Sequence, residues 1–147
     1  MNPNSVEVLL VEDSMVDAEL TIRDLQKHNM ANNLVHVKNG KDALDFIFAT
    51  GKYAGERDMQ FSPKIVLLDI QMPKVNGIEV LQKIKGDSRT RAVPVVILTS
   101  SKEHPDVQKC YDLGANSYIV KPVNFEGFAH AIQNLGFYWL LLNHPLT

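Results

Sequence analysis

Five short apolar runs, each followed by a helical pattern, constrain the fold of this 147-residue chain more than any other feature. The runs are unbroken and rich in Val, Ile and Leu, which is typical of strands buried on both faces of a sheet. After each run, apolar residues recur at every third or fourth position, as on one face of an amphipathic helix. The runs lie at residues 6–11, 34–38, 64–68, 94–99 and 117–120.

Repeated strand-then-helix units require right-handed crossovers, which place helices on both faces of a parallel sheet. We therefore predict a flavodoxin-like α/β fold, a (βα)5 three-layer sandwich around a five-stranded parallel sheet in the order 2-1-3-4-5. Local signals agree, because Ser14 and Asp17 resemble a capping box and Pro105 suits the first turn of a helix. Residues 52–63 show no clear period and are predicted to form a surface loop longer than most connections.

Length and charge exclude several classes of function. The chain is 45% hydrophobic and has the size of one globular domain. Its formal net charge of -2 lacks the basic footprint that nucleic-acid phosphates require, so we expect no nucleic-acid partner. The longest apolar run, residues 137–142, is far too short to span a membrane, and no signal peptide is visible, so we expect a cytoplasmic protein without a membrane partner. The single cysteine, Cys110, is predicted to be a small buried hydrophobe.

The residues that could carry chemistry stand where predicted strands finish. Asp69 follows the third apolar run, and Glu12 and Asp13 follow the first. Thr99 ends the fourth run and Lys121 comes directly after the fifth. In a parallel sheet these strand ends share one edge, which is where open α/β sheets place their ligands. We therefore expect three acids, a hydroxyl and an amine to converge there.

Three converging carboxylates indicate a metal, because they repel one another unless a cation neutralises them. Ligands that are all oxygen suit Mg²⁺ better than zinc or copper. An aspartate can also attack phosphorus, while Mg²⁺ and a lysine neutralise charge on the transferring group. An aspartate at this edge can thus form an aspartyl phosphate, and Thr99 could then donate a hydrogen bond to a phosphoryl oxygen.

The constellation resembles the receiver domain of bacterial two-component response regulators over the whole domain. Its motifs occur in the family's order and at the family's strand ends. They are Glu12-Asp13, the stretch 69–77 with Met72-Pro73 and Gly77, Thr99-Ser100, and Tyr118 three residues before Lys121-Pro122. The resemblance implies a signalling phosphoacceptor with no small-molecule substrate beyond the phosphodonor, rather than an enzyme.

The resemblance also implies a metal centre and a donor. Asp69 would accept a phosphoryl group from a sensor histidine kinase. Asp13, Asp69 and the backbone carbonyl of Gln71 would bind Mg²⁺, and Glu12 would act through water.

Further roles follow from the same resemblance. Lys121 would pair with the phosphoryl group, and the backbone of Ser100 would help to hold it. Pro122 would follow a cis peptide bond. Thr99 and Tyr118 would form the switch that responds to phosphorylation, although Tyr118 alone could also be a core aromatic.

The size, the loop before the third strand and the aromatic tail are similar to those of small cyanobacterial phytochrome response regulators. This narrower resemblance implies a phytochrome-linked kinase as the donor and a stand-alone receiver that acts by dimerising or docking. Residues 1–136 would then form the receiver, and residues 137–147 a C-terminal extension without a separate output domain.

Six consecutive apolar residues in the tail cannot all face one helical stripe. They could fold back on the same domain or make an interface. We predict a homodimer interface, because aromatic residues are enriched at interfaces and two-fold dimers are the commonest assemblies. The residues are Phe137, Tyr138, Trp139, Leu140, Leu141 and Leu142.

Two other classes of function stay open at this point. A small phosphohydrolase with an aspartyl-phosphate intermediate would need a second acid as general base and a substrate pocket. A phosphate-independent binding module would not need Asp13, Asp69, Thr99 and Lys121 together. The five histidines show no metal-ligand spacing and are predicted to lie at the surface.

Overall fold

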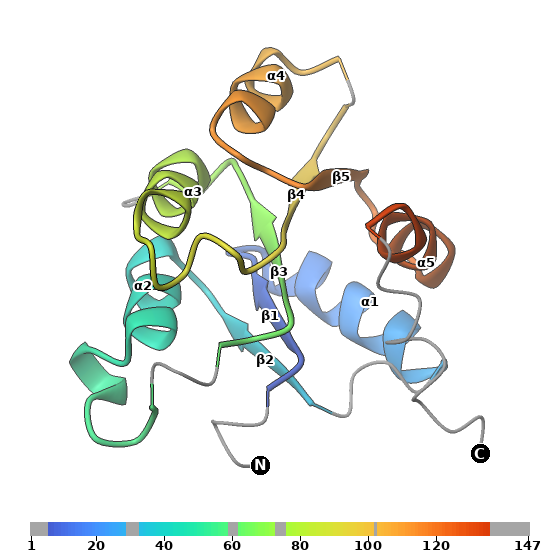
Figure 1. The fold of residues 1–147 in the computed structure, drawn as a ribbon. Helices are drawn as coiled ribbons and strands as arrows, with labels where there is room; N and C mark the ends of the chain where they lie inside the picture. Colours follow the sequence, from blue (N-terminus) through green and yellow to red (C-terminus); the bar gives the residue numbers. More distant parts are fainter. Residues whose placement is uncertain (1–5, 29–32, 59–61, 73–75, 102, 136–147) are drawn as a thin grey trace.

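The computed structural model describes residues 6–28, 33–58, 62–72, 76–101 and 103–135. Its centre is a five-stranded parallel sheet in the order β2-β1-β3-β4-β5, with helices on both faces (Figure 1). This arrangement confirms the predicted flavodoxin-like α/β fold and its strand order. The strands are β1 (Val8–Val11), β2 (Leu34–Val37), β3 (Ile65–Asp69), β4 (Val95–Thr99) and β5 (Ser117–Val120).

The helices divide between the two faces of the sheet, and each face has its own apolar core. On one face, α1 and α5 bury Leu25 and Phe128; on the other, α2 and α3 bury Phe46 and Ile84 against the strands (Figure 1). A fourth helix, α4, adds the buried thiol of Cys110 to the α2–α3 side, as predicted from its apolar spacing. The bounds are α1 (Met15–Gln26), α2 (Gly40–Phe48), α3 (Gly77–Gly86), α4 (Pro105–Asp112) and α5 (Phe125–Asn134), with a short 3₁₀ helix η2 (Gly51–Tyr53).

The strand register brings the carboxyl ends of the strands to one level. Val11 of β1 pairs with Leu68 of β3, one residue before Asp69. Asp69 in turn pairs with Leu98 of β4, one residue before Thr99. The loops that follow β1, β3 and β4 therefore begin side by side, which is the convergence that the sequence predicts.

The start of α1 differs from the predicted capping box. The Ser14 hydroxyl oxygen accepts the backbone N–H of Asp17 at 3.2 Å, so one half of the box forms. The backbone N–H of Ser14 donates instead to the carboxylate of Glu12. The Asp17 carboxylate is thus free to turn toward Lys121 rather than back toward Ser14.

The described part of the predicted surface loop at residues 52–63, residues 52–58, is more ordered than its composition suggests. It overlaps η2 and contains Arg57, which is only 6% exposed. The guanidinium lies 4.1 Å from the centre of the Phe46 ring and donates to the carbonyl oxygens of Phe46 and Ile47. Arg57 therefore satisfies carbonyl groups at the carboxyl end of α2 and covers the ring of Phe46.

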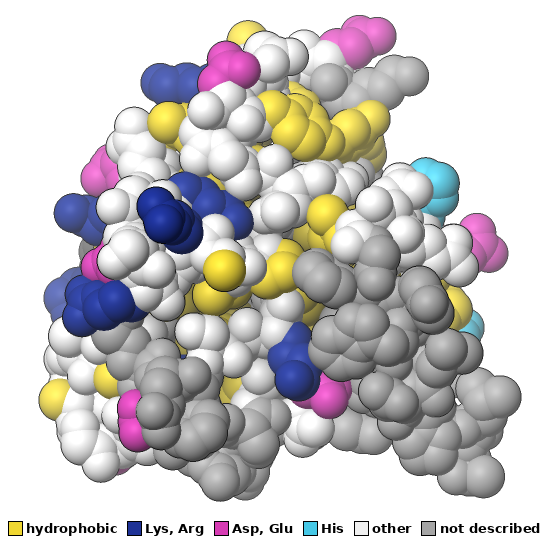
Figure 2. Space-filling view, viewed as in Figure 1, with side chains coloured by type: hydrophobic (Ala, Val, Ile, Leu, Met, Phe, Trp, Pro, Cys, Tyr) yellow, Lys and Arg dark blue, Asp and Glu magenta, His cyan; other side chains and the backbone are white. Residues whose placement is uncertain are grey.

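The outer surface carries apolar side chains on one side of the sheet. Figure 2 shows hydrophobic side chains gathered around α4 and β5, where Tyr111 and Val120 are both more than a third exposed.

Among the described residues, none of the helices has the length and the apolar character that a membrane span requires.

Candidate functional site

Three carboxylates form the floor of the site. Oxygen atoms of Glu12, Asp13 and Asp69 all lie within 4.8 Å of one another. Glu12 and Asp69 are only 2% and 3% exposed, whereas Asp13 faces solvent. The cluster therefore offers closely spaced oxygen ligands with one side open to water. Such a donor set fits a hard divalent cation.

Lys121 supplies the positive charge beside this cluster. Its Nζ lies 2.7 Å from Glu12 Oε1 and 3.0 Å from Asp69 Oδ2. The Asp17 carboxylate approaches the same ammonium at 3.5 Å. The backbone fixes the lysine, because its N–H donates to the carbonyl oxygen of Thr99. The bond from Lys121 to Pro122 is cis, as the resemblance implies.

The charges of the site shift two pKa values. The pKa of Glu12 is raised to about 7, chiefly by burial and also by the hydrogen bond with Asp69, while the hydrogen bond with Lys121 acts in the opposite direction. Burial alone would lower the pKa of Lys121, but its hydrogen bonds to Glu12 and Asp69 outweigh burial and raise it. Lys121 therefore stays charged at neutral pH, and one ammonium faces more negative charge than it can neutralise.

The loop after β3 is packed tightly against α3. The backbone N–H of Gln71 donates to Asp69 Oδ1 at 3.0 Å. A Cβ added at Gly77 would collide with the carbonyl oxygen of Asp69 and with the Cα of Ile70. Only glycine permits this approach, so the first residue of α3 helps to fix the backbone of Asp69. Pro73, part of the predicted motif, lies outside the described residues.

Thr99 lies beside Asp69 in the sheet but is bonded to its own loop. Its side chain is buried, and its hydroxyl donates to the carbonyl oxygen of Ser101 at 3.0 Å. Ser100, between them, is exposed. The hydroxyl proton of Thr99 is therefore already donated to Ser101. A new acceptor near Asp69 would have to compete with the carbonyl oxygen of Ser101 for it.

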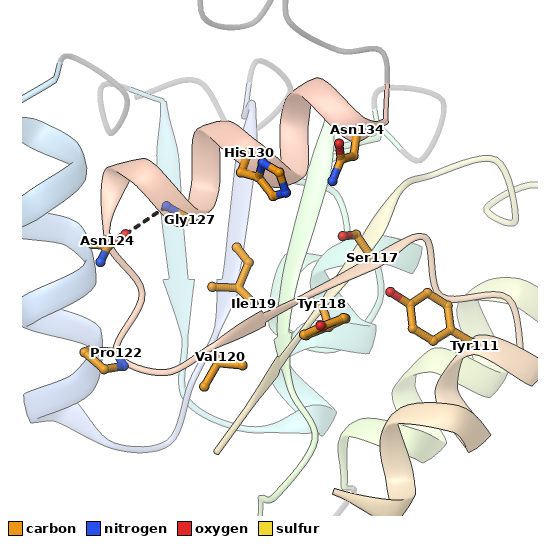
Figure 3. Close-up of a pocket in the computed structure, with 10 residues that line it drawn as sticks. All are labelled: Tyr111, Ser117, Tyr118, Ile119, Val120, Pro122, Asn124, Gly127, His130 and Asn134. Carbon is orange, nitrogen blue, oxygen red and sulfur yellow. Dashed lines mark hydrogen bonds between the residues drawn. The ribbon is translucent and has the colours of Figure 1, made fainter. Parts of the chain in front are cut away.

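Tyr118 lies next to a cavity between β5 and α5. Its ring is half-buried and packs edge-on against Tyr111 of α4, with 6.3 Å between ring centres. The cavity has a volume of about 400 Å³, and His130 of α5 and Pro122 also line it (Figure 3). Tyr118 therefore connects the strand that leads to Lys121 with the apolar surface over α4 and β5.

Sequence reasoning missed three residues that contact the site. Asp17 reaches Lys121, as described above. His36 Nε2 lies 2.7 Å from the backbone oxygen of Glu12, and His104 Nε2 lies 2.7 Å from the side-chain amide of Gln71. Both histidines are half-buried, which differs from the predicted surface placement; His28 and His130 are exposed, and His144 lies outside the described residues. The only available signals were that His36 falls on β2 and that His104 precedes Pro105.

The family assignment rests on the extent of the match. The profile of the response regulator receiver domain matches residues 8–133, which include every strand and helix described above except the last residue of α5. The chain belongs to the response regulator receiver domain family. This confirms the resemblance stated from the motifs.

Individual relatives agree with this assignment. The probable methanogenesis regulatory protein FilR2 of Methanothrix harundinacea is 38% identical over 90% of this receiver and 83% of its own length. Response regulator Rcp1 of Synechocystis sp. is 34% identical over 95% of this chain and 91% of its own length. Its solved Mn²⁺-bound form gives a TM-score of 0.73 at 32% identity and covers 97% of this receiver and 99% of that chain. The solved bacteriophytochrome response regulator AtBRR is 47% identical, with a TM-score of 0.84, over 95% of this receiver and 98% of that chain.

The predicted interface residues, Phe137 to Leu142, lie outside the described residues. The division between a receiver at residues 1–136 and an extension at residues 137–147 also stays a prediction.

Proposed function

We propose that this receiver accepts a phosphoryl group on Asp69 from a sensor histidine kinase. The observation that carries the proposal is the ammonium of Lys121, 3.0 Å from Asp69 Oδ2, beside two further carboxylates. Asp69 is a nucleophile at a strand end, and the ammonium of Lys121 can stabilise the negative charge that develops on the phosphoryl oxygens. Glu12 is also buried and contacts Lys121, but Asp69 differs from it in ending β3, with its backbone fixed by Gly77 and its carboxylate bonded to the Gln71 N–H.

The residues present fit a Mg²⁺ ion as the cofactor. Asp13, Asp69 and the carbonyl oxygen of Gln71 would hold it, and Glu12 would act through water. When bound, the ion neutralises charge on the transferring phosphoryl group. The all-oxygen cluster supports this proposal, and so does the manganese-bound form of the relative Rcp1.

In the transfer step, a carboxylate oxygen of Asp69 forms a bond to phosphorus while the bond from phosphorus to the donor histidine nitrogen breaks. Lys121 pairs with the phosphoryl oxygens, and the backbone of Ser100 helps to hold them. The phosphoryl group carries about two negative charges and three strong acceptor oxygens. It can therefore draw the Thr99 hydroxyl away from the carbonyl oxygen of Ser101.

The movement of Thr99 would change the signalling surface. As its loop moves inward, space opens for the Tyr118 ring beside the cavity in Figure 3. Both arrangements exist before phosphorylation, and phosphorylation shifts their populations by a coupling of about 1 to 3 kcal/mol. The receiver would then signal through altered docking or dimerisation.

We assign the donor to the phytochrome-linked histidine kinases. The likeness to AtBRR, a bacteriophytochrome response regulator, supports this assignment. The kinase must cover the rim of the site to bring its histidine to Asp69. Three exposed apolar residues of α1 lie on that rim near Asp17, and we assign the kinase contact to them: Met15, Val16 and Leu20.

Transfer of radiolabelled phosphate tests the assignment of the acceptor. Wild-type protein should take label from a phosphorylated histidine kinase in a Mg²⁺-dependent reaction, and Asp69→Asn should take none. Asp112→Asn, on the exposed side of α4, is the matched control and should label like the wild type. Labelling of Asp69→Asn at the wild-type rate would refute the proposal.

The same assay tests the contact surface and the type of activity. Leu20→Ser should slow labelling by the kinase but leave labelling by acetyl phosphate unchanged, because a small donor needs no docking surface. Equal slowing with both donors would contradict the assigned contact. Label that decays in a protein that does not turn over small phosphate esters separates a receiver from a phosphohydrolase.

A further inference from the structure

Gln71 and His104 contact each other between the loops that follow β3 and β4. Gln71 comes two residues after Asp69 and bonds it through the backbone, while its own side chain is exposed. His104 stands at the start of α4, after the loop that follows Thr99. The side-chain amide of Gln71 lies 2.7 Å from His104 Nε2. The contact therefore joins the β3–α3 loop to the β4–α4 loop.

The neighbours of the imidazole ring decide how this bond is formed. His104 Nδ1 accepts the backbone N–H of Asp106 at 3.1 Å and thereby caps α4. In the neutral ring the proton then sits on Nε2, which must donate. A half turn of the Gln71 amide places its oxygen at this position, and the Nε2–H of His104 donates to it.

His104 is also tied to the loop that holds the Thr99 hydroxyl. The backbone N–H of His104 donates to the carbonyl oxygen of Ser101 at 3.1 Å. The same oxygen accepts the hydroxyl proton of Thr99 at 3.0 Å. A change in the hydrogen bond of Thr99 therefore affects His104, because both residues donate to the carbonyl oxygen of Ser101.

We propose that His104 is a positioning residue for the phosphoryl chemistry: it holds the Gln71 side chain across the mouth of the Asp69 site and restricts access to Asp69. This inference rests on the proposed phosphoacceptor function and deepens it. With the bond in place, water and small donors reach the acceptor slowly. Without it, the Gln71 side chain swings away and the mouth opens.

Decay of the aspartyl phosphate measures the effect. His104→Ala and Gln71→Ala should each speed decay about three- to ten-fold, the equivalent of one net hydrogen bond. The double variant should decay no faster than either single variant, because both remove the same bond. His28→Ala, an exposed histidine that follows α1 and does not line the cavity beside Tyr118, is the matched control and should decay like the wild type.

A second variant separates the bond from the helix cap. Asparagine is a good N-cap residue, so His104→Asn keeps α4 capped, but its side chain is too short to reach Gln71. It should decay as fast as His104→Ala while keeping wild-type thermal stability. Wild-type decay in His104→Asn, or additive effects in the double variant, would overturn the proposal.

The bond can also be observed without phosphorylation. Long-range ¹H–¹⁵N correlation spectra of the unphosphorylated protein should show His104 with its proton on Nε2, as the Asp106 N–H requires. Gln71→Ala should shift the Nε2 resonance, because the acceptor of its hydrogen bond is lost. An unchanged ring pattern in Gln71→Ala would overturn the bridge itself. A bridge seen by this method in a protein that takes no label on Asp69 would instead overturn the proposed function and, with it, the positioning role.

Discussion

At the scale of single residues, Glu12 controls the charge balance of the site. It is 2% exposed, and its carboxylate contacts Lys121 and the backbone N–H of Ser14. Its pKa of about 7 lies above the ordinary value of 4.5, chiefly because of burial. Between these two values the folded protein binds more protons than the unfolded chain. The stability from this group is therefore fully present below the ordinary pKa and is lost as the pH rises through the folded pKa.

We expect the metal-free protein to become less stable between about pH 5 and pH 8, by at most ~3 kcal/mol of unfolding free energy. Glu12→Gln should flatten this dependence, because the amide does not titrate. Urea denaturation in the presence of a chelator measures both slopes. Added Mg²⁺ should restore stability at the higher pH, since a cation favours the charged carboxylates. An equal slope in Glu12→Gln would contradict the assigned cause.

The residues of the site differ in how far the sequence reveals them. The meeting of Glu12, Asp13 and Asp69 follows from strand order alone, because parallel strands end at one edge. The contacts of His36 and His104 depend on how loops fold back over that edge, and no periodic pattern encodes them. The sequence pattern of Ser14 and Asp17 predicts a helix cap, and only the structure shows the Asp17 carboxylate turned toward Lys121.

At the scale of elements, Gly77 sets how closely α3 approaches the acceptor loop. Its missing Cβ makes room for the backbone of Asp69 and Ile70. Asn76 caps the same helix by accepting the backbone N–H of Glu79. The start of α3 and the position of Asp69 are therefore one structural unit.

Gly77→Ala should lower the unfolding free energy by about 1 to 3 kcal/mol, because the new methyl group overpacks against backbone that cannot yield. It should also reduce phosphorylation of Asp69, since the acceptor loop must shift. Gly86→Ala, at the other end of α3 with open space around it, is the matched control. It should be neutral or slightly stabilising. Chemical denaturation and labelling check both variants, and equal behaviour of the two would contradict the role of Gly77.

Element types were easier to predict from the sequence than their details. The apolar runs located all five strands, but the first begins at Val8 rather than Val6. The sequence around Arg57 predicts a plain surface loop, because a charged residue without periodic neighbours gives no sign of burial. Its burial depends on the Phe46 ring and on the free carbonyl oxygens at the end of α2, which only the fold brings together.

At the scale of the whole molecule, the sheet joins the acceptor edge to the surface over α4 and β5. The apolar tail is predicted to contact a second copy of the chain in a homodimer. Its residues, Phe137 to Leu142, lie outside the described residues. We expect the wild type to sediment as a dimer at micromolar concentration and the double variant Trp139→Ala, Leu141→Ala to sediment as a monomer. A monomeric wild type under these conditions would refute the homodimer.

The central claim is that Asp69 is the phosphoryl acceptor. Its most direct test is to treat the protein with acetyl phosphate and Mg²⁺, reduce the product with borohydride and sequence the peptides by mass spectrometry. Borohydride converts an aspartyl phosphate to homoserine. We expect homoserine at position 69 only, and none when Mg²⁺ is withheld. Homoserine at Asp13 or another acid, or none in the presence of Mg²⁺ and a competent donor, would contradict it.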